Sequence, residues 1–414
     1  MSTIRSGLLR LLLALGGAAT VAPATLCAGS ADSGRGAAPP IGHVFVIVLE
    51  NKGYEESFGA ASPAPYLART LAARGVLLEQ YYGTTHYSLG NYLAMISGQA
   101  GTPETRADCD IFADFVAAGT SAAGQAIGHG CVYPASVRTL PDQLAEIGRT
   151  WRGYMEDMGN DPRRESATCG HAALDARDLT HHAEPPSAGV PLGDQYAARH
   201  NPFVYFHSII DSPACTANVV GLARLRHDLA SARRTPNFVF ISPNLCNDGH
   251  DAPCRDGAPG GLRSANAFLR KWVPLILASP AYRHDGLLII TFDEGDADAH
   301  QLPDGRYLVE FKGEKCCNQQ PGPNLAPFPQ AERHEKYTTT FRDFGGDRTG
   351  ALLLSPFLKP GTVATTPFNH YSLLRTLEDI FGTNGYLGYA GQAGLVGFFE
   401  RSGSDVALAS RPER

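Results

Sequence analysis

Apolar runs alternate with segments of helical spacing along most of this chain. The clearest run is 43–49, in which every residue after His43 is apolar. A run of this kind is typical of a strand that is buried on both faces of a sheet. Further segments with the composition of strands are 76–82, 151–156, 203–206, 237–242, 286–292 and 351–355.

The segments between these runs place apolar residues at helical spacing. They predict helices over 65–74, 89–96, 140–148, 222–232, 264–277 and 370–381. Gly75 and Gly98 follow two of them, where glycine favours a helix end. Because strands alternate with helices, the pattern predicts an α/β fold with a mostly parallel central sheet and helices on both faces.

Acids and amides follow three of the apolar runs. Glu50 and Asn51 follow 43–49, the segment 244–251 follows 237–242, and Asp293 and Glu294 follow 286–292. Surface turns would also explain each pair separately. However, the carboxyl ends of parallel strands share one edge, where open α/β sheets bind ligands. Clustered carboxylates repel one another unless a cation neutralises them, and such ligands suit Ca²⁺ or Mg²⁺, with Mn²⁺ as an alternative.

Ser88 lies directly before the predicted helix 89–96 and is the candidate nucleophile. An ordinary N-cap at this position would stabilise the helix by about 1 kcal/mol. The same position also sets a hydroxyl beside free backbone N–H groups and the positive end of the helix dipole, where a phosphate is held. We expect Asn91 to donate to a phosphate oxygen, and Thr85 is the second candidate nucleophile.

The N-terminus has the pattern of a secretory signal peptide, predicted over 1–28. Arg5 and Arg10 precede a short apolar core, and small residues follow it. Residues 29–40 read as a flexible leader, 41–400 as a single domain and 401–414 as a tail. A polar insertion around 100–200 is predicted to form a lid. We therefore expect a secreted or periplasmic protein without a stable membrane anchor.

Charge and cysteine content narrow the possible partners. Removing the first 24 residues deletes two arginines and no acids, so the formal net charge moves from −6 to −8. With no basic stripe, nucleic acid is not an expected partner. Eight of the nine cysteines remain if cleavage follows Ala28, which suggests disulfides in an exported protein. Proximity favours Cys109–Cys131 and Cys246–Cys254, and the absence of a CxxC pair disfavours a thiolate metal site.

Six motifs occur in a fixed order along the chain. They are ENKGY at 50–54, HYSLGNY at 86–92, HNPF at 200–203, PN with DGHD over 243–251, TFDEG at 291–295 and NHYS at 369–372. Over residues 41–385 this set resembles the phosphoesterase family of bacterial acid phosphatases and phospholipases C. The resemblance implies an alkaline-phosphatase-like fold.

The resemblance also implies a metal site made by Glu50, Asn51, Asp293 and Glu294 and completed by Ser88. The implied cofactor is a divalent cation, with Ca²⁺ or Mg²⁺ expected and Mn²⁺ or Zn²⁺ as alternatives. Glu294 stands where some relatives carry an aspartate, which would change the reach of that ligand.

The histidines of the motifs receive roles in the same way. His200 and His250 are implied to contact phosphate or to act as acid and base, with Asp251 beside His250. His370 is the histidine most open to a purely structural role, that of holding the last helix. Gly90 departs from the family pattern, in which proline is common at that position.

The predicted function is that of a secreted acid-phosphatase-type enzyme. Ser88 would attack a phosphate monoester and form a phosphoserine that water resolves. The substrate would be a phosphorylated small molecule or lipid, such as a phosphoinositide. A phospholipase C-type diesterase is the alternative, disfavoured because only a short tail follows the helix that ends near Phe381. A non-catalytic binding protein would lack the nucleophile or ligands, and none is missing. The oligomeric state stays open.

Overall fold

An eight-stranded sheet runs through the part of the chain that the computed structural model describes, residues 39–400. Its strand order is β15-β2-β14-β9-β1-β8-β6-β7. The strands are β1 His43–Leu49, β2 Val76–Leu78, β6 Trp151–Met155, β7 Val219–Gly221, β8 Phe238–Ser242, β9 Gly286–Phe292, β14 Ala351–Leu354 and β15 Thr362–Ala364. Only β14 runs antiparallel to its neighbours in this sheet. The predicted mostly parallel sheet is therefore confirmed.

Strand β1 lies at the centre of this sheet, between β8 and β9. Its side chains alternate between two separate cores, as the period of a strand requires. Val44, Val46 and Val48 belong to one core, and the residues between them belong to the other. Burial on both faces is the physical reason for the continuous apolar sequence of this strand.

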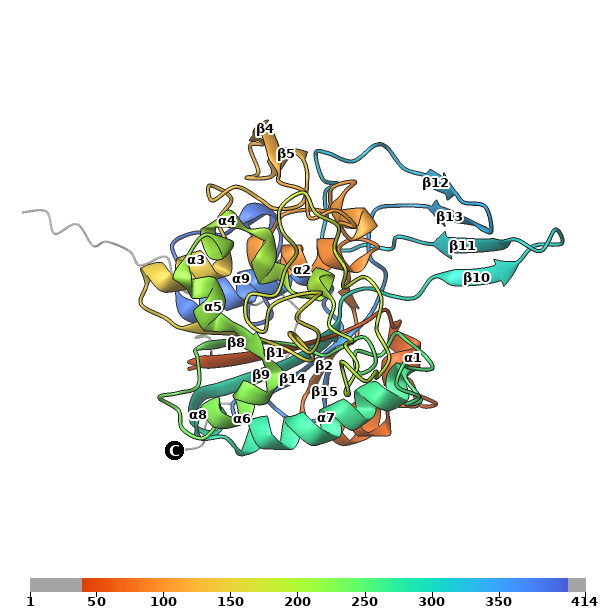
Figure 1. Cartoon of the computed structure of the whole chain (residues 1–414). Coiled ribbons are helices and arrows are strands. Elements are labelled where there is room, and N and C mark those ends of the chain that lie inside the picture. The colour runs from red at the N-terminus through yellow and green to blue at the C-terminus, as the bar shows by residue number, and fades with distance from the viewer. Residues whose placement is uncertain (1–38, 401–414) are drawn as a thin grey trace, which may run out of the picture. The chain divides into compact units, whose positions relative to one another are not determined.

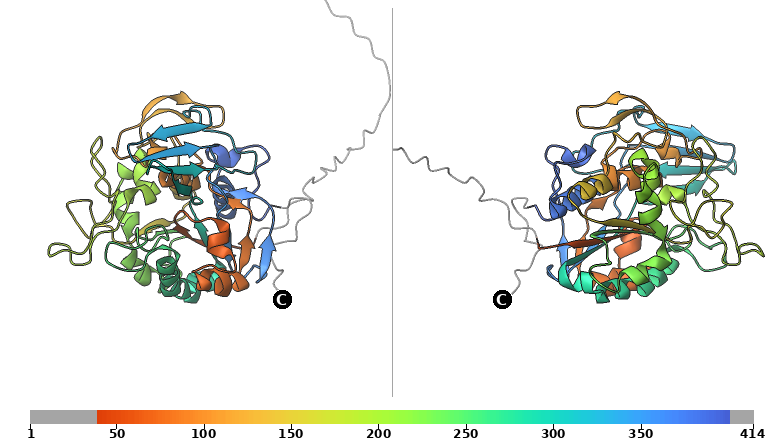
Figure 2. Two further views of the ribbon diagram at one scale, coloured as in Figure 1. Left: turned by 90° about the vertical axis from the view of Figure 1, so that its right-hand side faces the viewer. Right: turned by 60° about the vertical axis from the view of Figure 1, so that its left-hand side comes forward.

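Helices cover both faces of the sheet, as predicted (Figure 1). One face packs against α1 Tyr54–Phe58, α6 Leu225–Asp228, α7 Gly261–Ala278 and α8 Pro280–Asp285. The other packs against α2 Ser88–Ser97, α3 Leu140–Glu146, α4 His207–Ile210, α5 Pro213–Asn218 and α9 His370–Phe381. Figure 2 shows these layers from two further sides.

Shorter elements complete the described residues. A hairpin pairs β4 Val116–Thr120 with β5 Ala126–His129, and β3 Tyr81–Tyr82 pairs with β16 Phe368–Asn369. The other short helices are a π-helix, η1 Tyr66–Leu71, and the 3₁₀ helices η2 Ala72–Arg74, η3 Thr105–Ala107, η4 Ala198–His200, η5 Pro202–Tyr205, η6 Leu222–Arg224 and η7 Gly388–Gly391.

A second, four-stranded sheet was not predicted. It has the order β10-β11-β13-β12 and consists of β10 Asp298–Gln301, β11 Tyr307–Phe311, β12 Gln330–Arg333 and β13 Tyr337–Phe341. Its outer strands β10 and β12 are almost wholly exposed and lack an apolar face. Figure 1 shows these strands extending to one side of the main sheet.

Two predicted elements differ in the structure. The segment predicted as a strand near 203–206 is the 3₁₀ helix η5, which begins at Pro202; proline cannot donate to a strand ladder. The predicted helix over 222–232 is shorter, because η6 and α6 together end at Asp228.

Four disulfides link the eight cysteines in the described residues. The predicted pairs Cys109–Cys131 and Cys246–Cys254 are confirmed. The other two are Cys169–Cys215 and Cys316–Cys317. The predicted signal peptide, most of the leader and the tail lie outside the described residues. Within 39–400, no helix has both the length and the apolar character needed to cross a membrane.

Candidate active site

The ends of three neighbouring strands meet at one edge of the main sheet. The N–H of Glu50, after β1, donates to the carbonyl of Asp248, after β8, at 2.8 Å. The N–H of Asp293, after β9, donates to the carbonyl of Leu49 at 2.9 Å. The acidic segments that the sequence placed at one edge are therefore joined through their backbones.

Glu50, Asn51 and Asp293 form the first part of the site, called here the oxygen cradle. The backbone N–H of Asn51 donates to Asp293 Oδ1 at 3.0 Å. One end of the Asn51 side-chain amide lies 3.1 Å from Glu50 Oε2 and 3.3 Å from Asp293 Oδ1. If that end is the nitrogen, it donates to both carboxylates. If it is the oxygen, three oxygens face one another, and either a proton on a carboxyl or a cation must relieve their repulsion.

The oxygen cradle fits a divalent cation on the evidence of its own atoms. Asp293 Oδ2 is buried and has no hydrogen-bond partner, while Oδ1 already accepts two backbone N–H groups. Asn51 has a φ of 49°, a left-handed conformation that asparagine adopts more readily than most other non-glycine residues. Carboxylate and amide oxygens are the ligands that Ca²⁺ and Mg²⁺ prefer.

Ser88 contacts the oxygen cradle through Glu50. Its Oγ donates to Glu50 Oε2 at 3.0 Å, and both side chains are buried. Ser88 is the first residue of α2, and Tyr87 occupies the cap position with a φ of 70°. The predicted N-cap role of Ser88 is therefore wrong, since its hydroxyl bonds to Glu50 rather than to its own helix.

Asn91 holds the loop in front of Ser88. Its Oδ1 accepts from the N–H groups of Thr84 and Thr85, and its Nδ2 donates to the carbonyls of Thr85 and Tyr87. The side chain was expected to donate to a phosphate oxygen, but both ends of its amide are already committed to this loop. Thr85, the second candidate nucleophile, donates its hydroxyl to the carbonyl of His86.

Asp108 and Arg199 lie near the start of α2. Neither residue was predicted from the sequence to belong to the site. Asp108 Oδ1 accepts from the N–H of Leu89 at 3.0 Å. Its Oδ2 lies 3.8 Å from Arg199 Nε. Burial disfavours charge on Arg199, but Asp108 and Glu50 outweigh it and raise its pKa. The guanidinium of Arg199 therefore stays charged within the electrostatic environment of Glu50. Its place in the sequence, directly before the predicted site residue His200, was the one signal that could have identified it.

His200 lies between two carboxylates. Its Nε2 is 3.0 Å from Glu50 Oε1, and its Nδ1 is 3.8 Å from Asp248 Oδ2. The ring stacks on Tyr92, with centroids 5.1 Å apart. Burial and the charge of Arg199 hold the pKa of His200 well below its usual range, so the imidazole is neutral.

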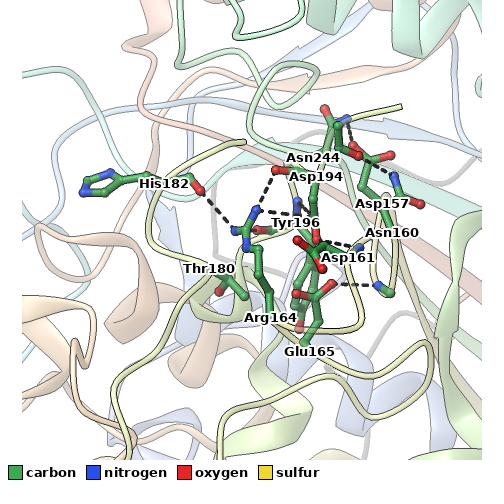
Figure 3. Close-up of polar contacts among 12 residues, drawn as sticks. Asp157, Asn160, Asp161, Arg164, Glu165, Thr180, His182, Asp194, Tyr196 and Asn244 are labelled. Carbon is green, nitrogen blue, oxygen red and sulfur yellow. Dashed lines mark hydrogen bonds and ion pairs between the residues drawn. The ribbon is translucent and has the colours of Figure 1, made fainter. Parts of the chain in front are cut away.

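A network of buried polar contacts fixes the segment that leads to His200 (Figure 3). Arg164 donates to the carbonyl oxygens of Asp194 at 2.7 Å, His182 at 3.0 Å and Tyr196 at 3.4 Å. The carboxylate of Asp194 in turn accepts from the N–H of Tyr196. Buried carbonyls that would otherwise lack donors are thus paired, and the irregular chain before η4 keeps one conformation.

The carboxyl groups of the site are difficult to ionise without a cation. Burial raises the pKa of Glu50 to about 7, despite the opposing charges of Arg199 and His250. Burial and the neighbouring Glu50 also raise the pKa of Asp293 and of Asp248. Buried carboxylates of this kind are stable as anions only when they are paired or coordinate a metal.

Glu294 turns toward His86 and forms a close ion pair with its Nδ1. His86 Nε2 lies 3.0 Å from Asp347 Oδ2. Burial favours the neutral imidazole, but the two carboxylates outweigh it and raise the pKa of His86 to about 9. One oxygen of the predicted ligand Glu294 is therefore committed to His86, a residue that the motif contained but to which no role was assigned.

His250 and Asp251 lie at the exposed side of the site. His250 Nδ1 is 3.1 Å from Asp251 Oδ1, and about half of the imidazole, 47%, is exposed. The hydrogen bond to Asp251 raises the pKa of His250 and lowers that of Asp251. The pairing therefore favours the protonated form of His250, and the backbone N–H of His250 donates to Asp248 Oδ1 at 3.0 Å.

His370, the first residue of α9, contacts the backbone of the site. Its Nδ1 accepts from the hydroxyl of Tyr81 at 2.8 Å, and its Nε2 donates to the carbonyl of Asp293 at 2.5 Å. Burial lowers its pKa to about 4, which fits a neutral ring in this chain of hydrogen bonds. It holds the backbone of a cradle residue, and its imidazole makes no contact with the cradle carboxylates.

Two groups of side chains within the described residues have the spacing of metal ligands. One is Glu50, His200 and Asp248, all buried. The other is Cys246, Cys254 and Asp256. The two cysteines are joined in a disulfide and offer no thiolate, so only the first group has its donor atoms available.

Comparison with known proteins identifies the family of this chain. The model of the Phosphoesterase family matches residues 61–384, which is most of the chain. The chain therefore belongs to the Phosphoesterase family, as the order of the motifs predicted.

Similar characterised sequences include a probable acid phosphatase of Kluyveromyces lactis, 24% identical over 61% of this chain and 47% of that protein. An acid phosphatase of Aspergillus fumigatus is 25% identical over 60% and 44%. The phosphatidylinositol-3-phosphatase of Mycobacterium tuberculosis is 26% identical over 64% and 68%. The chain spans about half the length of the fungal relatives that it matches.

Similar solved structures include a protein of the alkaline phosphatase superfamily from Vibrio parahaemolyticus. It is 12% identical, with a TM-score of 0.43 over 84% of this chain and 67% of that one. Murine ectonucleotide pyrophosphatase/phosphodiesterase 5 is 11% identical, with a TM-score of 0.44 over 85% and 99%. The predicted α/β class itself is confirmed by the mostly parallel sheet and the helices on both of its faces.

Proposed function

We propose that this protein hydrolyses phosphate monoesters, with Ser88 as the nucleophile. The observation that carries the proposal is the 3.0 Å hydrogen bond from Ser88 Oγ to Glu50 Oε2. It places a buried hydroxyl at the start of α2 and beside the oxygen cradle. Family membership and the similarity to acid phosphatases support the class of reaction.

Glu50, Asn51 and Asp293 are the residues proposed to hold a divalent cation, and an all-oxygen set favours Ca²⁺ or Mg²⁺. When bound, it would neutralise the facing carboxylates, lower the pKa of the Ser88 hydroxyl and polarise the phosphate. Glu294, expected as a further ligand, is proposed instead to orient the edge through His86.

In the first step, Ser88 Oγ attacks phosphorus and transfers its proton to Glu50, its hydrogen-bond acceptor. A bond forms between Oγ and phosphorus, the bond to the leaving oxygen breaks, and a phosphoserine results. Arg199 and the N-terminus of α2 stabilise the charge on the phosphate oxygens. Water then attacks phosphorus and gives a proton to His250, the bond between Oγ and phosphorus breaks, and Glu50 returns its proton to Ser88 as phosphate leaves.

His250 is the proposed proton donor to the leaving oxygen. It is half exposed, and its hydrogen bond to Asp251 raises the pKa of the imidazole and favours the protonated form that a proton donor needs. His200, the other histidine expected in this role, is buried and neutral, and holds no proton that it could readily donate.

The proposed substrates are monoesters of small molecules or lipids. The named activities of the fungal acid phosphatases and the mycobacterial phosphatidylinositol-3-phosphatase support this range. We further propose a secreted or periplasmic location, which the four disulfides support.

One paired assay tests the function. The full chain is given p-nitrophenyl phosphate and phosphatidylcholine across pH, with and without EDTA. We expect free phosphate from the monoester, and loss of that activity in Ser88→Ala but not in Ser97→Ala, a buried serine on the same helix. Release of diacylglycerol without hydrolysis of any monoester would instead indicate a phospholipase C-type diesterase.

A further inference from the structure

Four buried polar atoms next to the oxygen cradle have no hydrogen-bond partner. They are Glu50 Oε1, Asp248 Oδ2 and both ring nitrogens of His200. The exposure of the three residues is 2% for Glu50, 0% for Asp248 and 1% for His200. Because an unpaired buried polar atom is unfavourable, four in one place indicate a missing partner.

The spacing of these atoms suits a cation. Donor atoms of the three side chains all lie within 4.8 Å of one another. Ligands held about 2.0–2.2 Å from a zinc ion are separated by roughly 3–4 Å. The 3.0 Å between His200 Nε2 and Glu50 Oε1 is at the lower end of that range. Asp248 Oδ2 lies 3.8 Å from the other ring nitrogen, Nδ1, and a single ion would use only one of the two nitrogens.

Hydrogen bonding alone explains the arrangement less well. A bond from His200 Nδ1 to Asp248 would require about 2.7–3.2 Å, and the observed separation is 3.8 Å. The contact from Nε2 to Glu50 has a suitable length, yet neither atom has a hydrogen bond of acceptable geometry. Nε2 and Glu50 Oε1 are thus close enough to share a cation and poorly arranged to share a proton, and Asp248 Oδ2 lies nearest the other ring nitrogen.

Neighbouring contacts hold each donor in place. Asp248 Oδ1 accepts from the N–H of His250, which leaves Oδ2 directed at His200. The ring of His200 is stacked on Tyr92 at an interplanar angle of 10°. Glu50 uses Oε2 for Ser88, so its two oxygens face opposite parts of the site. A preorganised donor set of this kind lowers the cost of binding.

We propose that Glu50, His200 and Asp248 bind a second divalent cation, and that Glu50 bridges it to the cation of the oxygen cradle. Glu50 Oε2 serves the cradle and Ser88, and Oε1 serves the second position. An imidazole nitrogen beside two carboxylates favours a borderline ion such as Zn²⁺ over Ca²⁺ or Mg²⁺. The inference rests on the proposed function only through Glu50, which belongs to both positions.

The experiment counts ions on the full, disulfide-bonded chain. Metal-stripped protein is dialysed against Zn²⁺ and Ca²⁺ together, and all bound metal is measured by mass spectrometry of the metals. We expect two ions per wild-type chain and one in Asp248→Asn and in His200→Gln, with at least a tenfold weaker second affinity. Glu165→Gln is the matched control, because Glu165 is a buried carboxylate with one unpartnered oxygen in a different cluster, and it should keep two ions.

A second readout covers the case in which a variant does not fold. ¹¹³Cd NMR of the wild-type chain should show two signals, one from an all-oxygen site and one from a site with nitrogen. A single bound ion in the wild type, or two ions retained in both variants, would overturn the proposal. Ser88→Ala should still bind two ions. If that variant also retained full turnover, the proposed function would fail while the second cation site stood.

Discussion

Ser88 Oγ and Glu50 Oε2 are joined by a 3.0 Å hydrogen bond across 38 residues of sequence. The contact unites the start of α2 with the end of β1, so one carboxylate serves both as acceptor for the hydroxyl proton and as part of the oxygen cradle. Activity and cation binding should therefore respond together to changes at Glu50. The following predictions develop that relationship and its surroundings.

Glu50→Gln should lower kcat for p-nitrophenyl phosphate at least 100-fold, because the amide neither accepts the Ser88 proton as a base nor neutralises a cation. Its shape is nearly unchanged, so the fold should persist. Steady-state kinetics and circular dichroism check both parts. More than a tenth of wild-type turnover in a folded Glu50→Gln protein would show that Glu50 is not the acceptor.

Metal-free protein should lose stability as the pH rises. Burial raises the pKa of Glu50 from 4.5 to about 7, so the folded state binds a proton that the unfolded chain has released. The associated stabilisation is fully present below pH 4.5 and is lost as the pH rises through about 7. The loss from Glu50 should be about 3 kcal/mol.

Urea unfolding of EDTA-treated protein at pH 5 and pH 8 measures that loss. Glu50→Gln is the control, since it has no proton to release, and its pH dependence should be smaller by the same amount. An equal pH dependence in the two proteins would assign the effect to other groups. Added divalent cation should restore stability to the wild type at pH 8 by binding the folded state.

His86→Gln should destabilise the protein by roughly 3–5 kcal/mol, because it leaves the buried Glu294 without its charged partner. Adding Glu294→Gln should recover much of the loss, since the unpaired charge is then removed. Free energies of unfolding for the two single variants and the double variant test this coupling. Additive losses would mean that the ion pair does not link the two residues.

Gly90 lies where there is little room for a side chain. A Cβ at position 90 would lie 2.6 Å from Thr85 Cγ2. Gly90→Ala should therefore cost about 1–3 kcal/mol of stability, and Thr85→Ser, which removes that methyl group, should relieve the cost. Thermal unfolding of the pair decides the matter, and no relief in the double variant would place the clash elsewhere.

Arg199→Gln should weaken competitive inhibition by inorganic phosphate about tenfold to a hundredfold, the value of a charge-assisted hydrogen bond. The Arg199→Gln variant should keep the wild-type fold. Arg163→Gln, which alters an arginine that is 76% exposed, is the control and should leave inhibition unchanged. Equal inhibition constants for wild type and Arg199→Gln would remove Arg199 from the phosphate site.

The sequence predicted best the elements that are buried on both sides. The predicted bounds of β1, β9 and α9 match the structure, because apolar runs and helical periodicity report burial directly. The four-stranded sheet escaped prediction because strands such as β10 and β12 bury little. Stacking between Phe311 and Phe341 across β11 and β13 helps to hold it, a contact that sequence spacing does not reveal.

Some residues of the candidate site were predicted from the sequence and others were not. Glu50, Ser88 and Asp293 were predicted to lie together, because each stands at one end of a regular helix or strand. His86 and Arg199 were missed as functional candidates, since their partners come from distant segments: His86 and Glu294 are 208 residues apart. Such roles depend on tertiary contacts that a single sequence does not contain.

Trapping the phosphoenzyme tests the central claim most directly. Protein mixed with a ³²P-labelled monoester is quenched in acid within milliseconds, digested and mapped by mass spectrometry. The account predicts phosphoserine at Ser88 in the wild type and no label in Ser88→Ala. Label on Thr85, or unchanged turnover by Ser88→Ala, would contradict it.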